Sequence, residues 1–214
     1  QVAPAGDIPL TITRGRTGMV ELSSIDKDAA ILYTINKGKK AKQYTEPISM
    51  RDGGTVTAWF ANNPSIKTTT TFKKLETIQT EVIYASSEEV GDGDAKNLVD
   101  GDPATYWHSM YSVTVAKYPH WVDLDAGEVK TIKGFTYLPR QNSSNGNIKD
   151  YQLQVSNDGK NWGEIIVKGS FENNQEEKRV MFTKPVKARY VRFTALSSQN
   201  GDDFATGSEI KILN

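Results

Sequence analysis

The strongest constraint on the fold is that no segment keeps a helical spacing of apolar residues, whereas several short runs alternate apolar and polar residues. Such runs lie at 31–35, 121–125 and 151–155. A period of two places successive side chains on opposite faces of the backbone and is typical of a half-buried β-strand. Turns that contain glycine, such as 36–38 and 156–159, follow two of these runs. The sequence therefore predicts an all-β protein.

The predicted strands divide the chain into two parts. In residues 10–76 they are short and recur roughly every 8–12 residues, which favours a small β-sandwich. Residues 77–214 are richer in aromatic residues and carry longer alternating runs. About eight strands there would form an antiparallel jelly roll. Residues 1–9, which include two prolines and a glycine, are expected to be a linker.

Composition narrows the possible partners. Lys and Arg together number 26, as do Asp and Glu, so the formal net charge is zero. Nucleic acids and anionic membranes favour a basic excess, so neither is expected as the main partner. Apolar runs fall far short of the ~20 residues that span a bilayer, so no membrane insertion is expected. The chain has no Cys, which excludes disulfides and thiolate metal sites.

One short stretch concentrates polar ligands and an aromatic side chain. Residues 100–105 (DGDPAT) offer two carboxylates, a hydroxyl and turn carbonyls, the oxygen ligands that Ca²⁺ prefers. From the local sequence alone, an ordinary Asp-Gly turn explains them as well. The next residues include Trp107 and His108, which face opposite sides of an extended segment. We expect Trp107 in the core and His108 at the loop-lined end of the sandwich.

Motifs along residues 82–214 resemble the coagulation factor V/VIII C-type domain, or discoidin fold. More narrowly, they are similar to the carbohydrate-binding modules that are appended to bacterial glycosidases. The motifs occur in the family's order and cover nearly the whole second part of the chain. They are ASSEE (85–89), NLVDGDPAT (97–105), WHSMYS (107–112), PHWVDLD (119–125), GFTYLPR (134–140), NGNIKDY (145–151), VSNDGKNW (155–162), RYVRF (189–193) and SEI (208–210).

Residues 10–76 resemble the immunoglobulin-like domain on the C-terminal side of bacterial chitobiases and hexosaminidases. The similarity rests on ILYTI (31–35), YTEPI (44–48) and GTVTA (54–58). Such domains act as spacers, so the resemblance implies no binding site in this part of the chain.

The resemblance of the second part implies a structural calcium ion. Its ligands would come from the 97–105 loop and from the start of the last strand, and the ion would staple together two distant parts of the sequence. At the matching positions they are Asn97, Asp100, Asp102, Thr105, Ser208 and Glu209. Asp100 and Glu209 would bind through carboxylates and Thr105 through its hydroxyl and carbonyl, while the others would contribute mainly carbonyls.

The same resemblance implies a sugar-binding surface at the loop end. An aromatic ring would cover the apolar face of a pyranose, and polar side chains would bind its hydroxyls. At the matching positions these residues are His108, Tyr111, Arg140, Asn145 or Asn147, Glu89 and Phe204. Tyr111 stands where Trp is common in the family. The loop length leaves the choice between the two asparagines open.

The function implied is non-catalytic binding of terminal galactose or N-acetylgalactosamine on glycans. The glycosidase domain that it would target is expected elsewhere in the same parent chain. We expect a monomer in a secreted, periplasmic or cell-surface protein. No pattern indicates an enzyme, because neither His stands in a nucleophile context and no acid–nucleophile pair is specified.

The alternative is protein or phospholipid adhesion, as in animal discoidin-type domains. Those domains present hydrophobic loop spikes and often a bridging disulfide. This chain has no Cys and places polar residues at the predicted site, which favours sugar.

Overall fold

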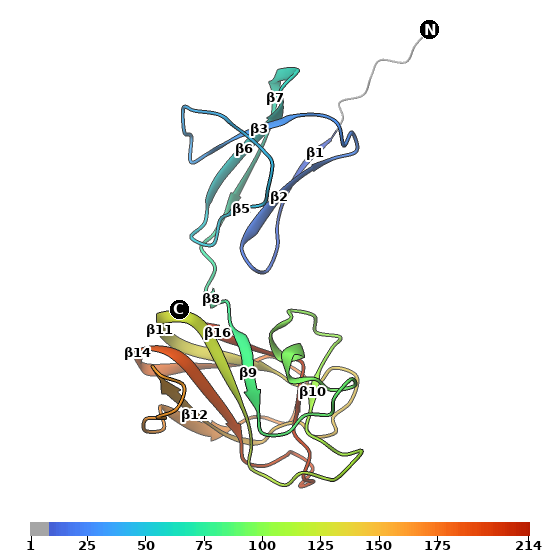
Figure 1. Cartoon of the computed structure of the whole chain (residues 1–214), viewed down its shortest axis with the longest axis vertical. Helices are drawn as coiled ribbons and strands as arrows, with labels where there is room; N and C mark the ends of the chain where they lie inside the picture. Colours follow the sequence, from blue (N-terminus) through green and yellow to red (C-terminus); the bar gives the residue numbers. More distant parts are fainter. Residues whose placement is uncertain (1–8) are drawn as a thin grey trace. The chain divides into compact units, whose positions relative to one another are not determined.

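The computed structural model describes residues 9–214, which divide between Leu75 and Glu76 into two compact units (Figure 1). Apart from Pro9, the predicted linker lies outside the described residues. In the described part, no helix is long and apolar enough to cross a membrane. The predicted all-β class is confirmed, since the helical content of residues 9–214 is one short 3₁₀ helix.

The first unit contains two small antiparallel sheets. One has the order β1-β2-β5, and the other has the order β4-β3-β6-β7. The strands are β1 (Leu10–Arg14), β2 (Met19–Ser24), β3 (Ile31–Ile35), β4 (Lys42–Gln43), β5 (Ile48–Ser49), β6 (Gly54–Phe60) and β7 (Asn63–Phe72).

Both sheets of the first unit contribute to one core. Ile12 and Leu22 come from the first sheet, and Val56 and Ala58 from the second. Strand β7 begins at Asn63, because a tight turn after Phe60 brings Asn63 into register with Phe60. The unit is therefore a small β-sandwich.

The second unit is built on a seven-stranded antiparallel sheet. Its order is β13-β12-β14-β11-β16-β8, with β9 also paired to β11. A two-stranded sheet, β10-β15, lies outside it. The elements are β8 (Thr77–Ile78), β9 (Glu81–Ala85), the 3₁₀ helix η1 (Ala95–Val99), β10 (Trp107–His108), β11 (His120–Leu138), β12 (Asp150–Ser156), β13 (Val167–Ser170), β14 (Lys178–Ala195), β15 (Thr206–Gly207) and β16 (Glu209–Leu213).

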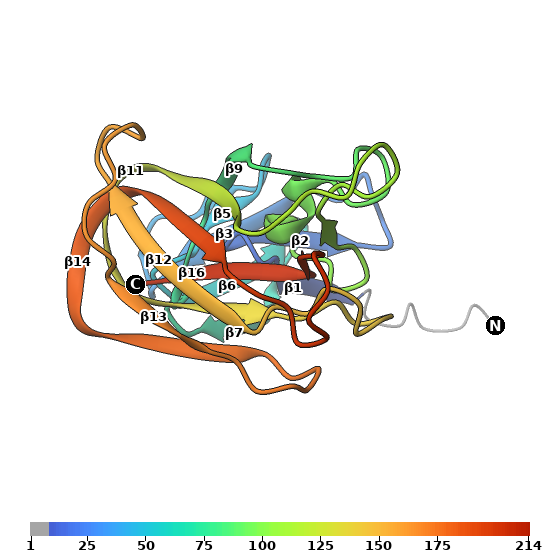
Figure 2. The same ribbon diagram turned by 90° about the horizontal axis from the view of Figure 1, so that it is seen from below.

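Two strands of this unit are longer than the sequence predicted. The predicted run 121–125 is only the first part of β11, which continues to Leu138, and β14 is likewise one long strand, Lys178–Ala195. The β11–β14 pairing shifts register between Asp125 and Lys130 and again between Ile132 and Gly134. Such irregularities bend a strand without ending it, and Figure 2 shows the resulting curvature of β14.

The core of the second unit is rich in stacked aromatic rings. Tyr151 lies 4.1 Å from Phe171, and Tyr137 lies 4.9 Å from the same ring, measured between centroids. Trp107 is fully buried, as predicted, and its indole N–H donates to the Ser87 carbonyl at 2.9 Å. This rigid core fixes the strand ends that carry the candidate site.

Candidate functional site

Three segments distant in sequence meet at β10 and β15. His108 is the antiparallel partner of Thr206. On its other side Thr206 forms a parallel bridge with Asn147. The Thr206 N–H donates to the Gly146 carbonyl and its hydroxyl to the Asn145 carbonyl, both at 2.8 Å. Backbone pairing thus brings the predicted site residues His108, Asn145 and Asn147 close to Thr206, which the sequence analysis did not select.

His108 is held in one tautomer. Its Nδ1 lies 2.6 Å from the Ser109 carbonyl, which can only accept, so Nδ1 carries the proton. In the neutral ring Nε2 is then a hydrogen-bond acceptor. Burial lowers the pKa of His108, and the nearby positive charge of Arg140 lowers it further. The ring is therefore neutral at pH 7.

Two aromatic rings pack against His108. The Tyr111 centroid lies 4.8 Å and the Phe204 centroid 5.3 Å from the imidazole, and the two rings are 6.5 Å apart. His108 is consequently only 3% exposed, whereas Tyr111 is 41% exposed. The sequence placed His108 at the loop end but did not reveal this enclosure. The three rings form a compact apolar cluster with the phenol at its surface.

The loop that carries Phe204 is fastened by neighbouring side chains. The Tyr118 hydroxyl donates to the Phe204 carbonyl at 2.5 Å, and His120 Nε2 donates to the Asp203 carbonyl at 2.8 Å. The Ala205 N–H donates to the Ser109 hydroxyl at 3.0 Å. His120 thus supports the loop by a hydrogen bond, and burial lowers its pKa.

Glu89 clasps the segment that carries Tyr111. Its carboxylate accepts the N–H groups of Tyr111 at 2.7 Å and Ser112 at 3.0 Å, and also the Ser112 hydroxyl. These hydrogen bonds hold the pKa of the Glu89 carboxyl below its usual range, and the bond from the Ser112 hydroxyl contributes most. The Glu89 N–H donates to the His108 carbonyl at 2.8 Å. An ionised Glu89 therefore ties Tyr111 to the strand of His108.

Arg140 lies flat on an aromatic ring that the sequence analysis did not select. Its guanidinium carbon is 3.6 Å from the centre of the Tyr106 ring, and its Nε donates to Asn142 Oδ1 at 2.6 Å. The two terminal nitrogens make no hydrogen bond within residues 9–214. They remain available as a planar pair of donors.

Asp92 is a second residue that the sequence analysis missed. It accepts the Tyr111 hydroxyl at 2.9 Å and lies 3.3 Å from the Tyr106 hydroxyl. A signal existed for Tyr106, which stands two residues before His108 and so faces the same side of an extended segment. No local pattern marks Asp92, because its contacts are made at the tips of side chains distant in sequence.

The two candidate asparagines differ in their surroundings. Asn147 is 3% exposed, and its Oδ1 is sealed without a hydrogen-bond partner in the described structure. Asn145 is half-buried beside Thr206. Both lie next to β15, but the amide of Asn147 is enclosed in the structure.

The predicted calcium ligands form a closed loop beside the last strand. Asp100 accepts the Asp102 N–H at 2.8 Å and the Thr105 hydroxyl at 2.7 Å, and the same hydroxyl lies 2.9 Å from the Asp102 carbonyl. Asn97 donates to the Tyr106 carbonyl at 2.9 Å. The oxygen atoms of the loop are thus already turned toward one another.

The last strand supplies the remaining members of this set. Helix η1, which contains Asn97, packs against β16, and Ser208 and Glu209 are 1% and 4% exposed. The Ser208 hydroxyl is buried without a hydrogen-bond partner in residues 9–214. No three His, Cys, Asp or Glu side chains are clustered as metal ligands in that range. The carboxylates of Asp100 and Glu209, with the hydroxyls and carbonyls of the other positions, are oxygen ligands of the kind that a hard cation takes.

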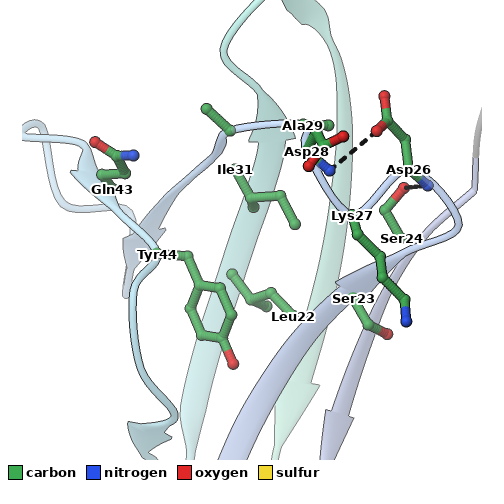
Figure 3. Close-up of a pocket in the computed structure, with 11 residues that line it drawn as sticks. Leu22, Ser23, Ser24, Asp26, Lys27, Asp28, Ala29, Ile31, Gln43 and Tyr44 are labelled. Atoms are coloured by element: carbon green, nitrogen blue, oxygen red, sulfur yellow. Dashed lines mark hydrogen bonds between the residues drawn. The ribbon is translucent and has the colours of Figure 1, made fainter.

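A hollow of about 490 Å³ lies in the first unit, between the end of β2 and the turn before β3 (Figure 3). Leu22, Ile31 and Tyr44 provide its apolar wall. Asp26 Oδ1 accepts the Asp28 N–H at 3.1 Å, so the Asp26 carboxylate stabilises the turn. Of the other polar lining residues, Ser24 is half-buried and its hydroxyl accepts the Asp26 N–H at 3.2 Å, while Ser23, Lys27 and Gln43 are exposed. They show no convergent set comparable with that around His108.

Comparison with known proteins assigns the second unit. The family model described as "F5/8 type C domain" matches residues 82–210. A sialidase of Micromonospora viridifaciens is 36% identical over 172 residues, which are 78% of this chain and 26% of the sialidase. The chain thus spans about a quarter of that relative's length.

Solved structures give the same assignment. One is a family 32 carbohydrate-binding module of Clostridium perfringens in complex with GalNAc-β-1,3-galactose. It is 34% identical to this chain with a TM-score of 0.58, and the match covers 64% of this chain and 96% of the module. A second family 32 module from C. perfringens, in complex with galactose, is 25% identical with a TM-score of 0.58 and covers 65% of this chain and 98% of the module. The predicted resemblance of the second part is confirmed.

Proposed function

Since the chain belongs to the F5/8 type C domain family, we propose that its second unit binds terminal galactose or N-acetylgalactosamine on glycans. The unit is non-catalytic, like the carbohydrate-binding modules that it matches. Two of the matched modules are in complex with galactose or GalNAc-β-1,3-galactose, which supports the choice of ligand. In this chain, the arrangement of His108, Tyr111 and Arg140 is the observation on which the proposal rests.

The site offers complementary hydrogen-bonding groups. Neutral His108 presents an acceptor at Nε2, and Arg140 presents terminal N–H donors. A sugar hydroxyl is both donor and acceptor, so one hydroxyl can donate to His108 while it accepts from Arg140. Such a pair selects a sugar whose hydroxyl points toward it. A sugar of the opposite configuration leaves polar groups unpaired, which costs about 1–3 kcal/mol.

The aromatic cluster supplies the apolar half of the site. Tyr111 is the exposed member, and the half-buried Phe204 stands beside it. The C–H groups of a pyranose ring would pack on these rings, while the clasp of Glu89 holds Tyr111 in place. A shallow site of this kind binds weakly, with a Kd of roughly 0.1–1 mM.

Weak binding suits a module that targets an attached enzyme. Tethering raises the local concentration of an enzyme at a glycan surface, so several weak contacts suffice. We place this chain in a longer, secreted or cell-surface glycosidase of a bacterium, with the first unit as an immunoglobulin-like spacer. The cation proposed at residues 97–105, 208 and 209 would be calcium with a structural role.

Titration calorimetry with galactose, N-acetylgalactosamine and glucose tests the proposal. Galactose and its N-acetylated form should bind, and glucose, which differs at the C4 hydroxyl, should bind at least tenfold more weakly. Both His108→Ala and Arg140→Ala should abolish measurable binding. Anionic phospholipid vesicles and a glycan array complete the experiment. Vesicle binding without any sugar binding would overturn the assignment and support adhesion.

A further inference from the structure

Asp92 links the two aromatic residues that flank the predicted sugar-binding groups. Its carboxylate lies in the loop between β9 and η1 and receives the Tyr111 hydroxyl at 2.9 Å. The Tyr106 hydroxyl is 3.3 and 3.4 Å from its two oxygens. Tyr106 precedes β10 and Tyr111 follows it, so one carboxylate connects both sides of the strand that holds His108.

Each of these rings is in contact with a different polar group of the site. The face of Tyr106 lies 3.6 Å from the Arg140 guanidinium carbon, and the rings of Tyr111 and His108 pack edge to face with their centroids 4.8 Å apart. A tyrosine ring that is bonded at its far end cannot swing freely about its Cβ. Fixing both hydroxyls on one carboxylate therefore fixes where Arg140 and His108 lie with respect to each other.

We propose that Asp92 is a positioning residue of the sugar site, which acts through the hydroxyls of Tyr106 and Tyr111 to hold Arg140 and His108 at the separation that one sugar hydroxyl requires. This inference rests on the proposed function. Asp92 itself touches neither His108 nor Arg140 by a hydrogen bond in the described structure. Its hydrogen bonds thus act on the ligand through the two rings, and its charge acts directly on His108 by favouring the protonated ring.

The chemistry of a carboxylate suits this role. Ionised Asp is an acceptor only, with two oxygens that take two hydroxyl donors at once. Asn in its place would keep one acceptor oxygen and present an NH₂ group that cannot accept a hydroxyl proton. The contact with Tyr111 is shorter than that with Tyr106, so loss of the Tyr111 hydroxyl should have the larger effect.

The experiment compares Asp92→Ala and Asp92→Asn with the Tyr106→Phe/Tyr111→Phe double variant and with the triple variant that adds Asp92→Ala. Galactose affinity is measured by calorimetry on the full chain. We expect Asp92→Ala to weaken binding about threefold to tenfold and Asp92→Asn to weaken it less. The triple variant should bind as the double variant does, because Asp92 would have no hydroxyl left to act on.

A spectroscopic measurement tests the contact itself without the sugar. The hydrogen bond to Asp92 raises the pKa of Tyr111. In Asp92→Ala the Tyr111 phenol should therefore ionise at lower pH, as followed by NMR of labelled tyrosine. Asp94, in the same loop, accepts the Gly91 N–H at 3.2 Å and has no hydrogen bond to a tyrosine within residues 9–214. Asp94→Ala is the matched control and should keep its galactose affinity.

The results separate the two proposals. If the unaltered chain binds neither galactose nor N-acetylgalactosamine, the proposed function fails and the role of Asp92 in it falls as well. If the unaltered chain binds and Asp92→Ala binds equally tightly, only the role of Asp92 is overturned. A full additional loss in the triple variant, or an equal loss in Asp94→Ala, would also overturn it.

Discussion

The guanidinium carbon of Arg140 lies 3.6 Å from the centre of the Tyr106 ring, so an aromatic face supports the charged group. Its Nε is bonded to Asn142, which leaves the two terminal nitrogens directed as one unit. The stacking and the single anchoring bond explain how an arginine in a loop can be ordered before any ligand arrives. Ordering in advance lowers the entropy cost of binding.

Arg140→Lys should weaken galactose binding about tenfold or more. Lysine keeps the charge but has neither a planar surface for Tyr106 nor a fork of parallel donors. Hydrogen bonds from a charged donor contribute about 1.5–3 kcal/mol, which corresponds to at least a tenfold change. Calorimetric titration measures the loss. Equal affinity in Arg140→Lys would show that only the charge of Arg140 matters for binding. The control is Arg189→Lys, because Arg189 is paired with Asp125.

Binding should also weaken as the pH falls below the ordinary histidine pKa of about 6.5. His108 accepts a sugar hydroxyl only while Nε2 is unprotonated, and burial lowers its pKa, so the loss begins on the acidic side of that value. Affinity measured from pH 8 to pH 5 should be constant at first and then decline. A Kd that stays unchanged while NMR of the His108 ring shows it taking up a proton would contradict an acceptor role for His108.

The two buried histidines, His108 and His120, should make the free energy of unfolding depend on pH. Burial lowers the pKa of both His108 and His120 in the folded state, so the unfolded chain takes up more protons below about pH 6.5. Their contribution is fully present above that pH and is lost as the pH falls through the folded-state values. Denaturant titrations at pH 7.5 and 5.5 measure it, and a His120→Gln variant should show a smaller difference than the unaltered chain.

Much of the fold could be predicted because alternation of apolar residues directly reports a strand and its buried face. The continuous strands β11 and β14 could not be predicted, since their bends depend on register shifts opposite another strand. His108 and Arg140 were proposed as site residues because they lie in motifs that resemble a family. Their neighbours Asp92 and Tyr106 were missed because contacts between side-chain tips depend on the tertiary structure. Burial of Asn147 likewise follows only from its bridge to Thr206.

Gly93→Ala should disturb the site by crowding His108. A Cβ at Gly93 would lie 2.6 Å from the His108 Cβ and 2.7 Å from its backbone N, where the strand cannot yield easily. Overpacking of this kind costs about 1–3 kcal/mol. We expect a lower melting temperature and weaker galactose binding. Gly163→Ala is the control, because a Cβ there meets its nearest atom at 3.7 Å, an ordinary contact. Equal melting temperatures for the two variants would contradict the close packing.

Calcium should stabilise the second unit if residues 97–105 and β16 bind it as proposed. An ion that binds only the folded state adds about 4 kcal/mol at a thousandfold excess over its Kd, a shift of roughly 8–16 °C in a domain of this size. The buried hydroxyl of Ser208, which has no partner in residues 9–214, is the local reason to expect a ligand there.

Thermal unfolding with calcium, with magnesium and with a chelator measures this shift. Removal of calcium should lower the melting temperature, and magnesium should restore less of it, because Mg²⁺ demands a smaller octahedral site. Asp100→Asn should melt at the same temperature with and without calcium, whereas Glu21→Gln, altered at an exposed residue of β2, should keep the full shift. Identical melting curves with calcium and with chelator in the unaltered chain would contradict the proposed calcium site. The hydrogen bond between Asp100 and Thr105 would then suffice to explain the conformation of the loop.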